Sequence, residues 1–400
     1  MKELKPGKSG RGGVTAPGDF LAAGIYSGVK RSGKKDLCLV FSKHPAAAAA
    51  VFTNNLVKAA PILLSQKQVR NGRIQAIVCN SGNANCCTGK QGMTDAYAMI
   101  DETALALGIK KGDVLIASTG VIGELMPMEK ILPGIKKAAG LVSQNGGRAA
   151  AEAILTTDTR AKQIAVALDG YTIGGVAKGS GMIAPSMATM HAFITTDAVV
   201  DKKTLQDALR DAVSETFNMI SVDLCMSTND CVFALANGAS KVKISSGKAS
   251  KRFTLALTHV CKHLAKEIAR DGEGATRLVE VKVTGAASKQ DAKRAALSIV
   301  SSDLFKAAVF GSDPNWGRIM GALGAVPIKL NPDKVDIFLN NIMIAQNGAK
   351  ASFSRSKMAR QMAKKELHYR VELKLGNESA EAWGCDLTYD YVKINARYHT

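Results

Sequence analysis

The sequence predicts a mixed α and β protein in which sheets and helices pack in layers. Short apolar runs rich in β-branched residues alternate with longer stretches of helical period along the whole chain. No repeat, low-complexity block or long linker interrupts this alternation. At 400 residues, the chain can bury one large core or two closely packed lobes.

The short apolar, β-branched runs are predicted to be strands. They span residues 36–42, 74–80, 113–118, 163–168, 191–196, 230–236, 279–285, 335–345, 370–376 and 386–396. Stretches with a 3.6-residue apolar period are predicted to be helices, at about residues 94–107, 129–141, 204–218, 254–269 and 357–365. The strands become more charged near residue 280, which predicts a smaller C-terminal α/β lobe from about that position.

Basic residues outnumber acidic ones, 53 to 34, which gives a formal net charge of +19. The basic residues are spread along the chain, aromatic residues make up only 5%, and no zinc-finger, RNP or helix-turn-helix pattern occurs. A solvated basic surface is therefore favoured over nucleic-acid binding. The positive field would also steer an anionic substrate, such as an acylated amino acid.

The chain begins with a polar, basic segment that lacks the apolar core of a secretory signal. No run of about 18 apolar residues occurs, so we expect no membrane span. None of the eight cysteines forms a C-x-x-C motif, and the adjacent Cys86 and Cys87 are a poor disulfide pair. This pattern is typical of reduced thiols in a cytoplasmic protein.

Thr189 lies in the segment KGSGMIAPSMATMHAFITTDA, residues 178–198, shortly before a predicted strand. A threonine hydroxyl is a weak nucleophile and needs a base. Cleavage of the Ala188–Thr189 bond would give Thr189 a free α-amino group, with a pKa near ~8, that could accept the hydroxyl proton. Pro185 and the glycines at 175, 179 and 181 could hold a bend for this cleavage. The alternative is an ordinary threonine at the entry to a strand.

Thr119 and Gly120 follow the predicted strand at residues 113–118. A glycine at a strand exit exposes backbone N–H groups, and the neighbouring hydroxyl adds a donor, as an oxyanion hole requires. The alternative is an ordinary β-turn.

Further blocks accompany these two features. They are GVTAPGDFLAAGIYSGVKRSGKKDL from residue 13, NSGNAN (80–85), ASTGVIGE (117–124), TTDT (156–159), STND (227–230), RDGEGAT (270–276), FGSDPNWGRI (310–319) and WGCDLTYDYVKINA (383–396). In these blocks and around Thr189, the chain resembles the ornithine acetyltransferase family, the glutamate N-acetyltransferases of arginine biosynthesis. The blocks occur in family order over essentially the whole chain.

The resemblance implies two stacked sheets flanked by helices, an αββα arrangement. It implies self-cleavage between Ala188 and Thr189 into fragments 1–188 and 189–400, which stay interwoven in one fold and form a heterotetramer with two copies of each. The enzyme would transfer an acetyl group from N2-acetylornithine to glutamate through an acetyl-Thr189 intermediate, with no metal or bound cofactor. Some family members also use acetyl-CoA as the donor, and no residue decides whether this chain does.

The resemblance also assigns site residues. Thr119 and Gly120 would form the oxyanion hole, and the substrate would bind to Thr156, Lys178, Thr189, Glu273, Asn395 and Thr400. Of these, a lysine can pair with a substrate carboxylate, and a glutamate with a substrate ammonium group. From the residues alone, the alternatives are a surface lysine, a loop carboxylate, a helix cap at Thr156 and a frayed C-terminal tail.

Two positions depart from the family pattern. His191 stands where the family more often has an apolar residue, and strand geometry would put it on the same face as Thr189. Residues 224–226, Leu-Cys-Met, stand where the family usually has small and acidic residues, a change that affects either local packing or assembly. His259 and His263 have the i, i+4 spacing of metal ligands, but no third ligand is evident in the sequence.

Two other function classes remain open. An N-terminal-nucleophile amidase or aminopeptidase would pass the acyl group to water, so it would release free acetate instead of acetylglutamate. A basic binding protein without catalytic activity would show no fragments, and its affinity for nucleic acid would fall steeply with salt.

Overall fold

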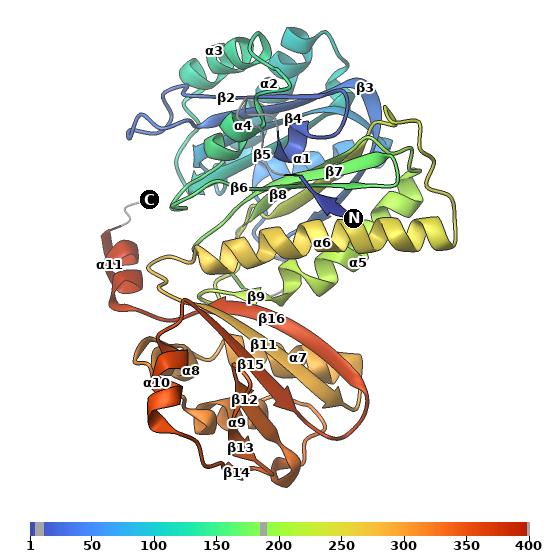
Figure 1. The fold of residues 1–400 in the computed structure, drawn as a ribbon. Helices are drawn as coiled ribbons and strands as arrows, with labels where there is room; N and C mark the ends of the chain where they lie inside the picture. The colour runs from blue at the N-terminus through green and yellow to red at the C-terminus, as the bar shows by residue number, and fades with distance from the viewer. Residues whose placement is uncertain (5–11, 185–189, 398–400) are drawn as a thin grey trace.

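The computed structural model describes residues 1–4, 12–184 and 190–397, and Figure 1 shows their arrangement. Ala188, Thr189, Pro185 and Thr400 therefore lie outside the described residues. Within the described ranges, nine strands form one sheet. Its order is β1 (Lys2–Glu3), β6 (Lys162–Leu168), β7 (Tyr171–Lys178), β8 (His191–Thr196), β10 (Cys231–Ala236), β3 (Leu37–Phe52), β4 (Arg73–Asn83) and β5 (Val114–Val121), and β2 (Phe20–Ile25) also pairs with β3.

The long strand β3 divides this sheet into two layers. Its first half, Leu37–Ser42, pairs with β2 and its second half, Ala47–Phe52, pairs with β10. Side chains then alternate between two cores, as strand geometry requires. On β10, Phe233 and Leu235 meet Leu115 of β5 in a core between the layers, whereas Val232 faces the other way. The two halves of the sheet are therefore stacked face to face.

Helices cover both outer faces of the stacked layers. The β2–β5 half packs against α1 (Ala60–Gln68), α2 (Gly89–Leu107) and α3 (Met128–Ala139), and α4 (Gly147–Ala153) lies against β2 and β3. The β6–β10 half packs against α5 (Lys202–Glu215) and α6 (Lys248–Arg270). The expected layered α+β architecture is confirmed.

A second sheet of seven described strands forms the lower part of the molecule in Figure 1. Its order is β14 (Ala349–Lys350), β13 (Ile342–Gln346), β12 (Asp336–Leu339), β15 (Glu366–Glu372), β11 (Leu278–Ala286), β16 (Glu378–Cys385) and β9 (Ile220–Ser221). The helices that follow β11 are α7 (Lys289–Val300), α8 (Asp303–Phe310), α9 (Trp316–Gly324) and α10 (Arg355–Met362). After β16, α11 (Tyr389–Arg397) returns toward the first sheet. Short 3-10 turns occupy Gly13–Thr15, Val69–Asn71, Lys111–Asp113, Phe217–Met219 and Pro332–Lys334.

Some predicted elements are wrong. Residues 386–396 were expected to be a strand, but α11 occupies most of this range. None of its residues is buried, so the apolar pattern reflects no core-facing side. Residues 335–345 are two strands, because Asn340 and Asn341 adopt positive φ angles of 44° and 70° in a hairpin turn. The described part of the chain contains no helix long and apolar enough to cross a membrane.

Candidate active site

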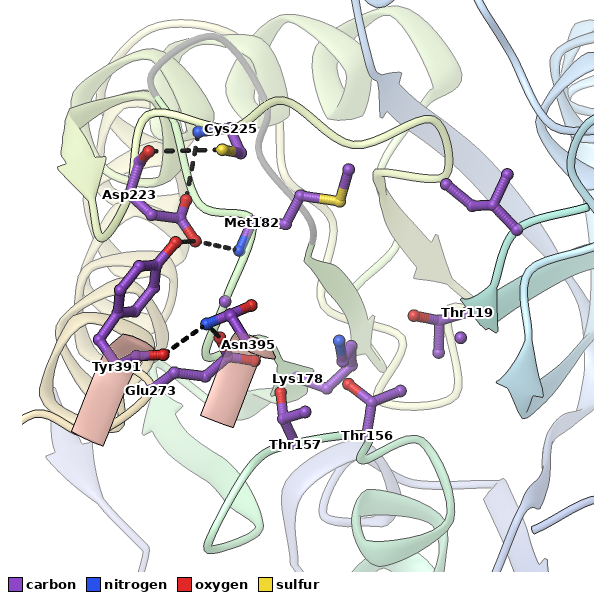
Figure 2. A pocket seen from close by; sticks show the side chains of 13 residues that line it. Thr119, Thr156, Thr157, Lys178, Met182, Asp223, Cys225, Glu273, Tyr391 and Asn395 are labelled. Atoms are coloured by element: carbon purple, nitrogen blue, oxygen red, sulfur yellow. Dashed lines mark hydrogen bonds between the residues drawn. The ribbon is translucent and has the colours of Figure 1, made fainter. Parts of the chain in front are cut away.

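A cavity of about 360 Å³ opens beside the ends of β5 and β7, and α11 closes one side of it (Figure 2). Segments far apart in the sequence supply its lining. The lining residues are Thr119, Gly120, Ile122, Thr156, Thr157, Lys178, Gly181, Met182, Asp223, Cys225, Glu273, Tyr391 and Asn395. The structure thus brings together every site residue assigned by the family resemblance that lies in the described ranges.

The first wall is the end of β5. Thr119 and Gly120 lie within this strand and not in a turn after it, because pairing with β4 continues to Val121. Gly120 has a φ of 135°, and a Cβ there would lie 2.3 Å from the carbonyl carbon of Gly82. Only glycine therefore allows the two backbones to approach this closely.

Lys178, at the end of β7, is buried and is not the surface lysine that the sequence left open. Its Nζ lies 4.0 Å from Oδ2 of Asp158. Burial lowers the pKa of Lys178, and the Asp158 carboxylate opposes this shift. An ammonium group at the edge of a cavity, with one carboxylate at the limit of ion-pair distance, is suited to an anionic ligand.

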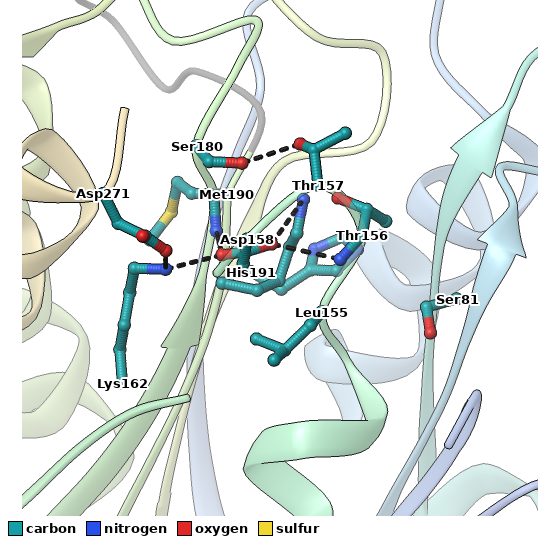
Figure 3. Close-up of polar contacts among 12 residues, drawn as sticks. Ser81, Leu155, Thr156, Thr157, Asp158, Lys162, Ser180, Met190, His191 and Asp271 are labelled. Carbon is teal, nitrogen blue, oxygen red and sulfur yellow. Dashed lines mark hydrogen bonds and ion pairs between the residues drawn. The ribbon is translucent and has the colours of Figure 1, made fainter. Parts of the chain in front are cut away.

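Asp158 is the centre of a buried ion network (Figure 3). Its carboxylate accepts hydrogen bonds from Nζ of Lys162 at 2.7 Å and from the backbone N–H groups of Gly179 at 2.7 Å and Thr156 at 3.0 Å. Lys162 also donates to Asp271 at 2.5 Å. Burial alone would raise the pKa of Asp158, but the two lysines and the Gly179 N–H hold it well below its usual value. The charged carboxylate therefore fastens the Thr156 loop to the end of β7, and Thr156 is no helix cap.

Glu273 lies opposite, in the loop after α6. Its backbone N–H donates to the Ser180 carbonyl at 2.8 Å, and Nδ2 of Asn395 donates to its Oε2 at 2.8 Å. A Cβ at Gly181 would lie 2.3 Å from the Glu273 carboxyl group, so a larger residue there would displace this carboxylate. Gly175, by contrast, is an interior residue of β7 paired with Ile194, and it does not belong to the expected bend.

Comparison with known proteins identifies the family. A family model described as the ArgJ family matches residues 21–400. The chain belongs to the ArgJ family. It is 52% identical to the arginine biosynthesis bifunctional protein ArgJ of Symbiobacterium thermophilum, over 97% of this chain and 99% of that protein. The corresponding protein of Caldanaerobacter subterraneus is 48% identical, again over 97% and 99% of the two chains.

A solved structure agrees. The crystal structure of the arginine biosynthesis bifunctional protein ArgJ from Bacillus halodurans has a TM-score of 0.50 and 43% sequence identity. The match covers 51% of this chain and 97% of that chain. The resemblance to the ornithine acetyltransferases that the sequence suggested is thereby confirmed.

Sequence reasoning gave no role to Asp223, although this ArgJ-family chain uses it to join three segments at the cavity. Its carboxylate accepts hydrogen bonds from the backbone N–H groups of Met182 at 2.6 Å and Ile183 at 2.8 Å, and from the Tyr391 hydroxyl at 3.3 Å. Burial, and then the Asp223 charge, raise the pKa of Tyr391 above its usual value. These contacts join residues up to 168 positions apart, and no sequence pattern records them.

The departure at residues 224–226 lies beside the cavity. Cys225 lines the cavity, whereas Leu224 is 52% exposed and has a φ of 60°. The Met226 carbonyl accepts a hydrogen bond from Nδ2 of Asn55 at 3.1 Å. Of the three altered residues, Cys225 therefore contributes to the lining of the cavity.

The histidines do not form a metal site within the described ranges, where no cluster of three or more His, Cys, Asp or Glu side chains could hold an ion. His259 contacts Glu3 at 2.8 Å. His191, the other departure from the family pattern, is buried behind β5 and is not among the residues that line the cavity.

Proposed function

We propose that this ArgJ-family chain transfers the acetyl group of N2-acetylornithine to glutamate. The observation that carries the proposal is the single cavity in which strand-end donors, a buried lysine and a glutamate converge. These are the groups needed to stabilise an oxyanion and to bind a substrate with both a carboxylate and an ammonium group. The names of the relatives place those proteins in arginine biosynthesis, which supports a substrate derived from ornithine.

We further propose that the chain cleaves itself between Ala188 and Thr189, giving fragments 1–188 and 189–400, with a C-terminal lobe from about residue 280. Lys178 and His191 are register partners at the adjoining ends of β7 and β8, so the chain between them leaves and rejoins the sheet beside the cavity. The solved Bacillus halodurans chain is almost fully matched by half of this chain. That proportion is expected when a precursor is divided into two chains of similar length.

In the proposed reaction, Thr189 Oγ attacks the acetyl carbonyl carbon while the α-amino group of Thr189 takes the hydroxyl proton. Thr119 and Gly120 would stabilise the oxyanion. The C–N bond then breaks, and the proton returns to the leaving amine of ornithine. Glutamate's amine attacks the acetyl-threonine ester in the second half-reaction, which releases N-acetylglutamate and restores the Thr189 hydroxyl.

Substrate recognition follows from charge. Lys178 would pair with the carboxylate of the bound amino acid, and Glu273 would pair with an ammonium group. Asn395 would hold Glu273 in place, because its amide already donates to that carboxylate. The backbone N–H of Thr156 is bound to Asp158, so Thr156 would offer its hydroxyl to the substrate as a hydrogen-bond donor. Thr400, which lies outside the described residues, would complete the pocket.

The word bifunctional in the relatives' names supports a second activity, in which acetyl-CoA replaces acetylornithine as the donor. We also propose a cytoplasmic heterotetramer with two copies of each fragment. Neither extension alters the roles assigned to the cavity.

The first test is the intact mass of the freshly purified, denatured protein. We expect two species, the second beginning at Thr189, and expect Thr189→Ala to give one uncut species without transfer activity. Thr94→Ala, an exposed threonine of α2, is the matched control and should behave as wild type. An uncut wild-type chain, or an active Thr189→Ala variant, would contradict the proposal.

A second test follows the acyl acceptor. With acetylornithine and glutamate present, acetylglutamate should accumulate in step with released ornithine. If free acetate accumulates at that rate instead, the chain is an amidase and glutamate is not its acceptor.

A further inference from the structure

The imidazole of His191 occupies the space between the two sheet layers. It projects to the same side of β8 as Phe193, and the two rings stack with centroids 6.2 Å apart. The ring is fully buried, yet it contacts the backbone of β5, in the opposite layer. The proposed reaction gives this side chain no role.

Both ring nitrogens have a partner at hydrogen-bond distance, the backbone of Met190 also contacts the ring, and the shortest contact indicates the tautomer. Nε2 lies 3.0 Å from the Ser118 carbonyl oxygen, which can only accept, so Nε2 carries the proton. Nδ1 lies 3.2 Å from Sγ of Cys231, whose thiol therefore donates. Burial, and then the Lys178 charge, lower the pKa of His191 to about 3, so the ring is neutral. Burial also raises the pKa of Cys231, which keeps the thiol protonated.

The Ser118 carbonyl belongs to the peptide group that leads into Thr119. Besides His191, Nδ2 of Asn229 donates to this oxygen at 2.8 Å. The Ser118 hydroxyl donates to Oδ1 of Asn80 at 2.6 Å. Two side chains, His191 and Asn229, thus hold the carbonyl of the last peptide group before the oxyanion-stabilising pair, and Asn80 holds the side chain of the same residue.

We propose that His191 is a positioning residue for Thr119 and Gly120: its Nε2–H, together with Asn229, fixes the Ser118–Thr119 peptide, and Cys231 holds the required tautomer. This inference rests on the proposed function, because it assumes that Thr119 and Gly120 stabilise the oxyanion. His191 does not touch substrate; it acts through β5.

The expected effect is on turnover more than on substrate binding. Donors stabilise an oxyanion only when they lie at hydrogen-bond distance from the developing charge. A small rotation of the peptide group would therefore reduce the stabilisation of the transition state. Lys178 and Glu273, which are proposed to bind the ground state, do not contact His191 by hydrogen bond or ion pair in the described structure. Loss of the imidazole donor should therefore lower kcat with little change in KM.

The experiment compares His191→Leu, which removes the donor, with His191→Gln, whose amide can still reach the carbonyl as a donor. Rates are normalised to the cleaved fraction measured by intact mass. For His191→Leu we expect kcat to fall about tenfold, the effect of one hydrogen bond, and KM to stay within about twofold. His191→Gln should recover most of the loss. His44→Leu, on an exposed histidine, is the matched control and should match wild type.

Imidazole ¹⁵N NMR of the wild-type protein gives an independent reading. The chain has six histidines, and His191→Gln identifies the His191 signals. We expect the Nε2–H tautomer, unprotonated at pH 5, and a mixture of tautomers in Cys231→Ala.

Three results would overturn the inference: an Nδ1–H tautomer in the wild type, an unchanged kcat in a fully cleaved His191→Leu enzyme, or a lowered melting temperature as its sole defect. If His191→Leu does not fold or cleave, His191→Gln and the tautomer decide. Failure of the proposed function gives a different result. The wild-type protein would then lack acetyl-transfer activity, whereas NMR would still show the Nε2–H tautomer of His191.

Discussion

The two sides of the cavity are built differently. Lys178 lies on a strand, 2% exposed, above the Asp158 carboxylate, which also binds Lys162. Glu273 lies on a loop and is held by Asn395 of α11, a helix with no buried residue. The Lys178 side is therefore fixed when the protein folds, whereas the Glu273 side depends on a few contacts near the surface. A rigid side can set the orientation of a substrate, and a weakly held side can let it enter and leave.

The largest expected effect, on the free energy of unfolding, comes from removing the charge of the Asp158 carboxylate beside Lys178. Asp158→Asn leaves two buried lysines with Asp271 as the remaining carboxylate of the network, and loss of one partner of a buried ion pair costs about 3–5 kcal/mol. We expect that loss in the free energy of unfolding at pH 7, measured with urea. Because the pKa of Asp158 is depressed in the fold, its contribution is present above its ordinary pKa and declines as pH falls below it. Asp169→Asn, at a partly exposed ion pair, is the control and should cost about 1 kcal/mol or less.

The next effect tests the Lys178 side as a binding site. Lys178→Ala removes one charge-assisted hydrogen bond to a carboxylate, worth about 1.5–3 kcal/mol, so KM should rise about tenfold to a hundredfold. Steady-state kinetics with acetylornithine and with glutamate measure it. Lys203→Ala, on the exposed face of α5, is the control. If KM is unchanged for both substrates, Lys178 is not part of the site.

The rigid side should also respond to acid. His191 has a folded-state pKa lowered to about 3, so the unfolded chain binds a proton near pH 6.5 that the fold excludes, and stability falls as pH decreases between these values. Between pH 7 and pH 5, His191→Leu should lose about 2 kcal/mol less stability than wild type. Urea titrations at both pH values measure this, with His44→Leu as control. Equal losses in wild type and His191→Leu would mean that the imidazole is protonated in the fold, beside Lys178, Asp158 and Cys231.

The smallest effect is expected at the surface side. Asn395→Ala removes one hydrogen bond to Glu273, worth about 0.5–1.5 kcal/mol, so KM should rise severalfold. The melting temperature should not change, because α11 contributes nothing to the core. Lys393→Ala, on the same helix, should leave KM unchanged. A lower melting temperature in Asn395→Ala would show that this side is as firmly built as the other.

The layered α+β class could be predicted from the sequence because alternation and helical period record burial, whereas the stacking of two sheets was implied by the family resemblance. β7 was missed because Gly174 and Gly175 lower strand propensity. A side chain at Gly174 would lie 1.9 Å from the Gly13 carbonyl oxygen, a constraint that appears only in three dimensions. α11 was misassigned because aromatic and β-branched residues such as Tyr389, Tyr391 and Val392 are typical of strands, and this helix has no buried residue.

The part of the candidate site that lies in family motifs could be predicted from the sequence. Thr119, Thr156 and Glu273 stand in blocks typical of the family, and the fold brings them to one cavity. The network beneath them was not predictable, since Lys162 meets Asp271 across 109 residues and no sequence pattern pairs Lys162 with the block that contains Asp271. Roles that depend on an exact contact, such as the pairing of His191 with Ser118, likewise require coordinates.

The order of strands in the first sheet has a consequence for how the molecule is made. β8 and β10 lie between β7 and β3, so strands that follow the proposed cut are inserted between strands that precede it. Two separately made halves would each lack a neighbour along two seams. The strand order therefore favours folding of the single polypeptide before the proposed cut. After the cut, no peptide bond would connect the two fragments. Refolding from the denatured state would then be a bimolecular reaction, slow in dilute solution and dependent on protein concentration.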